Sequence, residues 1–113
     1  MDIDFADARL RETCNNQKRL VKTHGERRAR KIRLRLDQLR AAATLAEFQH
    51  VHRGCHPLHY DREGEWAADL DGGYRLIFEA NHSPLPTRAD GVTLDIEKIT
   101  AVKILEVTDY HGG

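Results

Sequence analysis

The sequence predicts a single α+β domain, because helix-like spacing of apolar residues fills its first half and strand-like alternation fills its second half. The turn Asp71-Gly72-Gly73 separates two of the alternating stretches and is typical of a β-hairpin. A chain of 113 residues is large enough for one modest core, so we treat residues 1–113 as one domain. The expected architecture is a set of N-terminal helices packed on an antiparallel sheet.

The N-terminal segment is expected to hold a short strand followed by short helices. Residues 1–5 could form the strand, and either Asp4 or Asp7 could cap the first helix. Asn15-Asn16 interrupts this helix, and a further helical stretch is expected over Gln17 to His24.

The longest predicted helix follows a break at Gly25 and runs from about Glu26 to Ala43. Apolar residues recur in it at spacings of three and four and form one stripe: Ala29, Ile32, Leu36, Leu39 and Ala43. Cations surround that stripe: Arg27, Arg28, Arg30, Lys31, Arg33, Arg35 and Arg40. Because only Glu26 and Asp37 oppose them within the helix, we expect a strongly cationic outer surface.

Three strands are expected in the second half. Two alternating stretches flank the hairpin turn, and an apolar run, Ala101 to Val107, supplies the third strand. Arg75 alternates with the aromatic positions of its strand, so it is expected on the opposite face, as a fixed cation available to a ligand. The apolar positions of the two hairpin strands are Trp66, Ala68, Leu70, Tyr74, Leu76 and Phe78.

The remaining segments are shorter or irregular. Thr44 is expected to cap a short helical turn that runs through Phe48. Residues 50–63 are polar and rich in histidine, and we expect them to be irregular. Asn81 to Asp95 contains two prolines and is expected to form a long loop between strands, of the kind that is functional or mobile.

Charge is divided unevenly along the chain. Residues 1–55 hold 13 Lys/Arg against 7 Asp/Glu, whereas residues 56–113 hold 5 against 11, so the net charge is zero. This division suggests a basic face for a polyanion or an acidic partner, although a solvated helix surface explains it equally well. The chain has no long apolar run and only two cysteines, so we expect a soluble, cytoplasmic protein with no membrane contact.

Several motifs together resemble the HigB-type toxins of the RelE/ParE superfamily, the killer proteins of bacterial toxin–antitoxin modules. These motifs are Cys55-His56-Pro57-Leu58, Asp61-Arg62-x-Gly64-x-Trp66, Gly73-Tyr74-Arg75-Leu76-Ile77-Phe78 and Asp109-Tyr110-His111. The helix around Ile32-Arg33 also resembles that family, and the segment Asn81 to Ile99 resembles the insert of a longer subgroup, some of whose members are labelled killer suppression proteins.

This resemblance implies a fold, an activity and partners. The fold would be N-terminal helices on a curved antiparallel sheet. The activity would be ribosome-dependent cleavage of mRNA, which inhibits translation, and the partner would be a neutralising helix-turn-helix antitoxin of the HigA kind. By motif position, the catalytic residues would be His56, Arg75, Asp109, Tyr110 and His111. Arg62 falls on a basic loop position, and His59 stands where many relatives have lysine.

RNA cleavage without a metal uses the 2′-hydroxyl of the substrate as the nucleophile, with a base, an acid and a cation for the phosphoryl charge. His56 and His111 suit proton transfer, since imidazole exchanges protons near neutral pH. Arg75 and Arg62 could hold the phosphate. If the last strand stays extended, Asp109 and His111 share one face, and Tyr110 lies on the other, free to donate a hydrogen bond or to stack on a base. The expected sites for ribosomal RNA phosphates are Arg27, Arg30, Lys31, Arg33 and Arg35.

Other interpretations of the same residues stay open. Arg75 could pair with Glu65 or Glu79 across the hairpin, and His56 could be an ordinary loop residue. The protein could instead act by binding, as a gyrase-inhibiting toxin of the ParE type or as a catalytically weak member with an antitoxin or regulatory role.

A cluster of metal-binding residue types, His50, His52, Cys55, His56 and His59, lies within ten residues. Its spacing matches no standard zinc motif, so we expect neither a metal nor any other cofactor.

Overall fold

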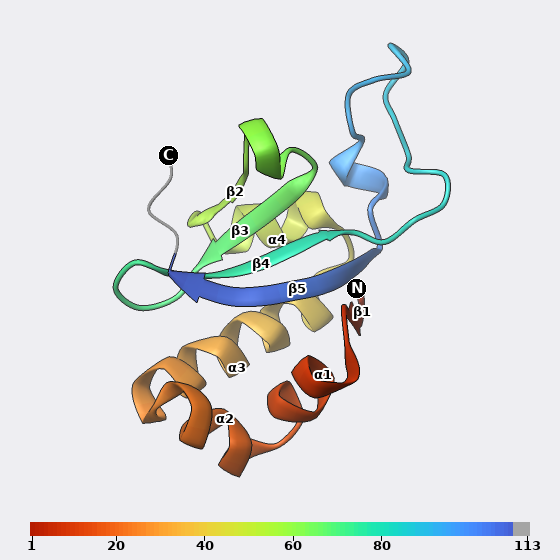
Figure 1. Ribbon diagram of the computed structural model, residues 1–113. Helices are drawn as coiled ribbons and strands as arrows, with labels where there is room; N and C mark the ends of the chain where they lie inside the picture. Colours follow the sequence, from red (N-terminus) through yellow and green to blue (C-terminus); the bar gives the residue numbers. More distant parts are fainter. Residues whose placement is uncertain (110–113) are drawn as a thin grey trace.

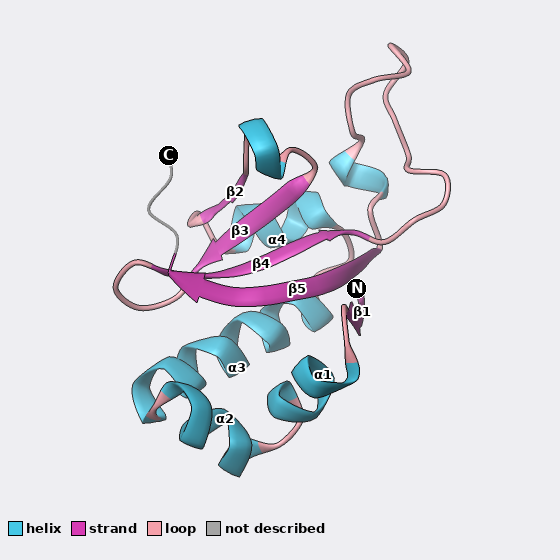
Figure 2. Ribbon diagram, in the orientation of Figure 1, coloured by secondary structure: helices cyan, strands magenta, loops and turns pink. Residues whose placement is uncertain are grey.

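The computed structural model describes residues 1–109 as one α+β unit. The helices are α1 (Ala8–Cys14), α2 (Gln17–His24), α3 (Glu26–Ala41) and α4 (Leu45–Val51). The strands are β1 (Asp2–Phe5), β2 (Cys55–Pro57), β3 (Glu65–Asp69), β4 (Tyr74–Ala80) and β5 (Ala101–Asp109). Short 3₁₀ turns lie at Tyr60–Arg62 and Ile96–Lys98. Figure 2 shows the helices gathered against a curved sheet.

The strands form one sheet in the order β1-β5-β4-β3-β2. The expected antiparallel strands β3, β4 and β5 are confirmed, and so is the N-terminal strand, which pairs with β5 in parallel. The sheet is therefore mixed. The register of β4 with β5 shifts between Ile77 and Phe78, because Ile77 lies opposite Glu106 and Phe78 lies opposite Ile104. The extra residue, Leu105, bends β5 at this point.

The helices cover one face of the sheet, which we call the helix face. Its core joins buried residues of every helix to the strands, for example Leu20, Leu36 and Phe48 with Leu76 and Phe78. The ring of Phe48 lies 6.1 Å from that of Phe78 in an edge-to-face arrangement. The opposite face, which we call the outer face, carries a smaller buried cluster: Leu58, Ala67 and Ile77, with Leu105 packed against it. The two faces therefore differ in what they leave exposed.

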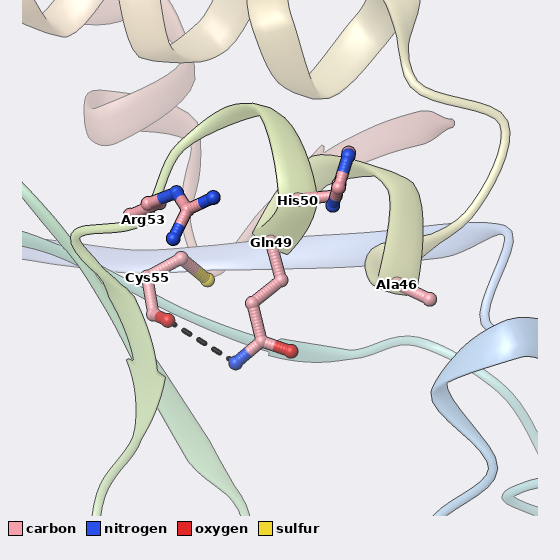
Figure 3. A pocket seen from close by; sticks show the side chains of 5 residues that line it. All are labelled: Ala46, Gln49, His50, Arg53 and Cys55. Atoms are coloured by element: carbon pink, nitrogen blue, oxygen red, sulfur yellow. Dashed lines mark hydrogen bonds between the residues drawn. The ribbon is translucent and has the colours of Figure 1, made fainter.

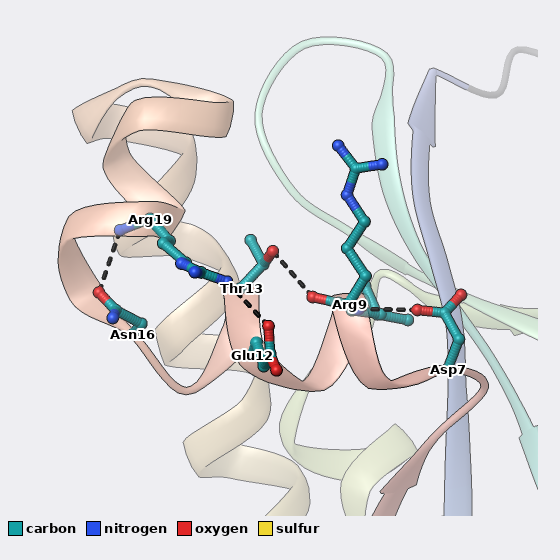
Figure 4. Close-up of polar contacts among 7 residues, drawn as sticks. Asp7, Arg9, Glu12, Thr13, Asn16 and Arg19 are labelled. Carbon is teal, nitrogen blue, oxygen red and sulfur yellow. Dashed lines mark hydrogen bonds and ion pairs between the residues drawn. The ribbon is translucent and has the colours of Figure 1, made fainter.

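Polar side chains define the ends of the short helices, as Figure 4 shows for α1 and α2. The Asp7 carboxylate accepts a hydrogen bond from the backbone N–H of Leu10 at 2.8 Å, so Asp7, not Asp4, caps α1. Asn16 accepts from the N–H of Arg19 at 3.1 Å and caps α2. Gly25 has a φ of 81°, which a residue with a side chain rarely adopts, and it separates α2 from α3.

Two boundaries differ from the sequence-based expectation. The helix expected to reach Ala43 ends at Ala41, and the backbone at Ala42 is extended. Ala42 is buried and Ala43 is exposed, so Ala42 takes the place in the core that the spacing assigned to Ala43. The turn of helix capped by Thr44 continues beyond Phe48 to Val51.

Strand β2 falls inside a segment that was expected to be irregular. Its three residues pair with β3 at the edge of the sheet. Pro57 fits this position because an edge strand tolerates a residue without an N–H.

The loop Asn81 to Asp95 is confirmed as an excursion between β4 and β5. One isolated pairing, Thr87 with Leu94, holds its two arms together. Within residues 1–109, no helix has the length and apolar character needed to cross a membrane.

Candidate functional site

His56 and Arg75 lie on the same face of the sheet, the outer face. His56 lies opposite Ala67, which lies opposite Ile77, and that residue lies opposite Glu106. In the adjacent row, Asp69 lies opposite Arg75, which lies opposite Thr108. Since residues directly opposite each other share a face, His56 and Arg75 occupy neighbouring rows of the same face. The expectation that Arg75 points away from the aromatic positions is confirmed.

Arg75 is held by Asp69 and by its own strand. Its Nε lies 2.7 Å from Asp69 Oδ1, and its Nη1 donates to the carbonyl oxygen of Tyr74 at 3.0 Å. Its side chain is 23% exposed. The cross-strand partner is therefore Asp69 and not Glu65 or Glu79. The guanidinium is fixed in place, and a phosphate bound there would have to share it with a carboxylate.

Arg62 reaches the same face from the 3₁₀ turn between β2 and β3. Its Nη2 donates to Glu106 at 2.6 Å, and its Nε donates to Glu65 at 3.1 Å. Glu106 belongs to the row of His56, so these bonds tie the turn to the outer face. Arg62 is thus a fixed part of the site and is already paired with carboxylates.

Asp109 lies on the other side of the sheet. It lies opposite Tyr74, whose side chain packs against the core on the helix face. Because side chains alternate along a strand, Asp109 and Arg75 point to opposite faces. The structure therefore does not bring Asp109 to the His56–Arg75 face. The other two residues expected there, Tyr110 and His111, lie outside the described residues.

The cations of α3 differ in their exposure and in their carboxylate partners. Arg27, Arg30 and Arg33 are exposed and have no carboxylate partner within residues 1–109, and Lys31 is half-buried. Arg28 pairs with Asp71 at 2.9 Å, and its guanidinium carbon lies 3.4 Å from the centre of the Tyr74 ring. Arg40 lies 3.5 Å from Asp37.

Arg35 was expected among the exposed cations, but it is buried. Its side chain donates to the carbonyl oxygen of Asp69 at 2.8 Å and to Gln38 Oε1 at 3.1 Å. Burial lowers the pKa of this guanidinium, and Asp69 opposes that effect. Arg35 therefore joins α3 to the end of β3 and is not available to an external phosphate.

His52 lies beside the Asp69 end of the site. A side chain at Gly54 would meet Asp69 Oδ2 at 2.6 Å and His52 Cε1 at 2.8 Å, so only glycine fits between them. Burial lowers the pKa of His52, Arg35 and Lys31 lower it further, and Asp69 opposes them. Its buried Nε2 has no hydrogen-bond partner within the described residues. The fold therefore favours the neutral form of His52.

A shallow pocket of about 440 Å³ lies between α4 and β2, as Figure 3 shows. It is lined by Ala46, Gln49, His50, Arg53 and Cys55, and the Gln49 amide donates to the carbonyl oxygen of Cys55 at 3.2 Å. Burial and the nearby Asp69 raise the pKa of the Cys55 thiol to about 12. This thiol is therefore protonated near neutral pH and does not act as a nucleophile.

No group of three or more histidine, cysteine, aspartate or glutamate side chains placed to hold a metal ion occurs in residues 1–109. The five residues of the histidine-rich segment instead divide between α4, the turn after it, the edge strand and the loop after that strand.

Two residues of the site, Asp69 and Glu106, were not predicted from the sequence. Asp69 could have been found, since counting outward from the Asp71-Gly72-Gly73 turn places it opposite Arg75. Glu106 could not, because the bulge in β5 changes the register before it.

Comparison with known proteins assigns no family: no protein-family model matches this chain, and no curated protein matches it.

Proposed function

We propose that this chain is a toxin of a type II toxin–antitoxin module, a HigB-type member of the RelE superfamily that cleaves mRNA on the ribosome. The observation that carries the proposal is the outer face, which is shared by His56 from an edge strand, Arg75 from a hairpin and Arg62 from a turn. An imidazole on the same face as two fixed guanidinium groups is a combination suited to phosphoryl transfer. The α+β architecture is compatible with that fold family.

In the proposed reaction, the 2′-hydroxyl of the substrate attacks the adjacent phosphorus and loses its proton to a base. The bond to the 5′-oxygen breaks, an acid protonates that oxygen, and the products are a cyclic 2′,3′-phosphate and a free 5′-hydroxyl. His56 would carry one of these protons, and His111 would be the partner proton carrier, as in the resembling family. Arg75 would stabilise the extra negative charge on the phosphoryl oxygens. No metal takes part in this scheme.

The exposed cations of α3 would bind ribosomal RNA. Arg27, Arg30 and Arg33 offer guanidinium groups free of carboxylate partners in the described chain, and they lie on the helix side of the sheet. A contact there and a contact at the outer face would engage different RNA segments, which suits a ribosome better than a short free RNA. A cytoplasmic location and a helix-turn-helix antitoxin complete the proposal.

Induced expression of single variants tests the function. His56→Ala and Arg75→Ala are each expected to abolish growth arrest and the appearance of new mRNA 5′ ends, and so is His111→Ala. The matched control is His50→Ala, an exposed histidine of α4 outside the outer face, which should retain both effects. Circular dichroism would establish that each variant is folded. Arrest by all three site variants would contradict the catalytic assignment, and arrest with intact mRNA but damaged DNA would favour gyrase inhibition.

A second function, binding without efficient catalysis, is favoured by one observation. Arg62 and Arg75 are each paired with carboxylates, at 2.6 Å and 2.7 Å. Asp69→Asn and Glu106→Gln remove those competing charges. If the wild type is active, these variants should change cleavage modestly; if it is a weak enzyme limited by the pairs, they should raise cleavage. No cleavage by the wild type or by either variant would support the binding role.

A further inference from the structure

Tyr60 adopts an unusual conformation in the turn between β2 and β3. Its φ is 62°, and among residues 1–109 it is the one residue other than glycine with a positive φ. L-amino acids avoid this region because the side chain crowds the backbone, so a bulky residue there is strained. The fold gains little from the side chain in return: the Tyr60 ring is 90% exposed and makes no hydrogen bond or ring contact with the described residues.

The turn that presents Tyr60 is fixed to the sheet. The N–H of Leu58 donates to the carbonyl oxygen of Glu65 at 2.8 Å, and the N–H of Glu63 donates to that of Tyr60 at 3.2 Å. Arg62 adds its bonds to Glu65 and Glu106. Figure 1 shows this turn standing on the side of the sheet away from α1, α2 and α3. Tyr60 therefore belongs to a turn that Arg62 anchors to the outer face, the face that also carries His56 and Arg75.

The surroundings of Tyr60 bear on the kind of ligand that its ring would contact. His59 precedes it, Asp61, Arg62 and Glu63 follow it, and a groove of about 440 Å³ begins beside His59. Trp66, Leu85 and Val92 line this groove, and Val92 is 83% exposed. An exposed aromatic ring is a surface on which proteins stack unpaired bases, because every base has a face that stacks.

We propose that Tyr60 is a base-stacking residue, which holds an unpaired nucleotide of the RNA next to the phosphate engaged by His56 and Arg75. This inference rests on the proposed ribonuclease function and extends it to substrate positioning. It also explains the strained backbone: the positive φ is retained because it points a ring toward the substrate, and local strain of this kind is characteristic of functional sites.

Three variants at one position separate stacking from structure. Tyr60→Phe keeps the ring and should retain cleavage of mRNA on programmed ribosomes to within about twofold. Tyr60→Ala removes the ring and should lower kcat/KM by about 5–150-fold, the range that corresponds to loss of one stacked base. Tyr60→Gly also removes the ring but relieves the strained φ, so it should lose activity while its Tm rises by roughly 2–4 °C.

An abasic nucleotide, placed in turn at each position of the A-site codon, tests the contact from the RNA side. At one position the wild type should lose about as much activity as Tyr60→Ala loses on intact RNA, and Tyr60→Ala should lose nothing further. Equal cleavage by the wild type and Tyr60→Ala would overturn the proposal. So would equal losses by both proteins at every abasic position.

Failure of the proposed function is distinguishable from failure of the stacking inference. If the wild type does not cleave, its affinity for a fluorescein-labelled single-stranded RNA of twelve nucleotides, intact and abasic, measures stacking alone. Base-dependent affinity that Tyr60→Ala abolishes would support the inference, and equal affinities would overturn it. Unchanged cleavage together with loss of a partner protein in Tyr60→Ala would assign the ring to a protein contact and would also overturn it.

Discussion

Arg35 is a charged residue whose side chain is buried and bonds to the end of β3. Its guanidinium leaves the surface of α3 and binds the backbone of Asp69, the residue whose side chain fixes Arg75. A single position, Asp69, thus receives a helix cation on its carbonyl oxygen and a sheet cation on its carboxylate. The geometry of the candidate site depends on this shared anchor, and so does the contact between α3 and β3.

Replacement of Arg35 by methionine is expected to destabilise the protein by about 2–3 kcal/mol. The change keeps most of the apolar stem but leaves the carbonyl oxygen of Asp69 without its donor. Urea unfolding would measure the loss. The matched control is Arg33→Met on the exposed side of the same helix, which should change stability by no more than about 0.5 kcal/mol. Similar losses in both variants would contradict the role assigned to Arg35.

Stability is expected to fall as pH falls from about 7 to 5, through His52 and His24. Burial lowers the pKa of both histidines in the folded protein, and Arg35 and Arg28 respectively add repulsion. Below pH 6.5, the ordinary pKa of histidine, these two residues bind protons in the unfolded chain but remain largely unprotonated in the folded chain. The free energy of unfolding therefore decreases as pH falls. Above 6.5 both states are neutral at these positions, and this contribution to pH dependence disappears.

His52→Gln should therefore flatten the dependence of unfolding free energy on pH, by at most about 1.4 kcal/mol per pH unit. Urea unfolding at pH 5, 6, 7 and 8 measures the slope. His50→Gln changes an exposed histidine in the last turn of α4, just before His52; it serves as the control and should leave the slope unchanged. Identical slopes for the wild type and His52→Gln would show that His52 is not held neutral by the fold.

At the scale of elements, the short helices depend on their caps. Helices α1 and α2 contain 7 and 8 residues, too few to be stable alone, and each has one side chain that satisfies a terminal N–H. Asn16→Ala removes the cap of α2 and should cost about 1 kcal/mol in a urea unfolding experiment. Asn15→Ala is the control, since Asn15 bonds through its backbone N–H; its expected effect is within about 0.5 kcal/mol.

The elements that sequence patterns predicted are those whose signals are local. The break at Asn15-Asn16, the helix Gln17–His24, the cap at Thr44 and the glycine hairpin turn all follow from side chains that act within a few residues. The long loop before β5 follows equally from its prolines and glycine. In each of these cases, the residue that directs the backbone is also the residue that the pattern recognises.

Tertiary contacts determine the features that local sequence patterns did not predict. Strand β2 has three residues and no alternation, and it is a strand only because β3 offers it an edge. Helix spacing placed Arg35 with the cations, but the end of β3 supplies a carbonyl oxygen that draws it inward. Asp109 was grouped with Arg75 because both fall on motif positions that are functional in the family that the chain resembles. The register with Tyr74, which depends on a bulge, places it on the other face.

At the scale of the whole molecule, the divided charge corresponds to surfaces of different character. The exposed cations of α3 lie on the helix side of the sheet, whereas the outer face mixes Arg62 and Arg75 with Glu65, Asp69 and Glu106. General attraction to RNA should therefore depend on the helix, and the outer face should contribute position and chemistry.

The dependence of RNA affinity on salt tests this division. Replacement of both Arg30 and Arg33 by alanine should reduce the slope of log affinity against log salt by about 1.4, since each phosphate contact contributes about 0.7 on a single strand. The control is the double variant Arg11→Ala with Arg19→Ala, which removes the same charge from residues paired with Asp4 and Glu12. Fluorescence anisotropy measures both slopes. Equal reductions would indicate attraction to overall charge and not to α3.

The order of strands also bears on how the protein is made. Strand β5 follows every other strand in the chain, yet it lies inside the sheet, between β1 and β4. Until β5 has been synthesised, β1 has no strand to pair with, and β4 has a partner only on its β3 side. Pairing that spans the chain from Asp2 to Ala101 makes assembly a late and slow event. The bond between Arg62 and Glu106 on the outer face consequently forms only after the chain through β5 has left the ribosome that translates it.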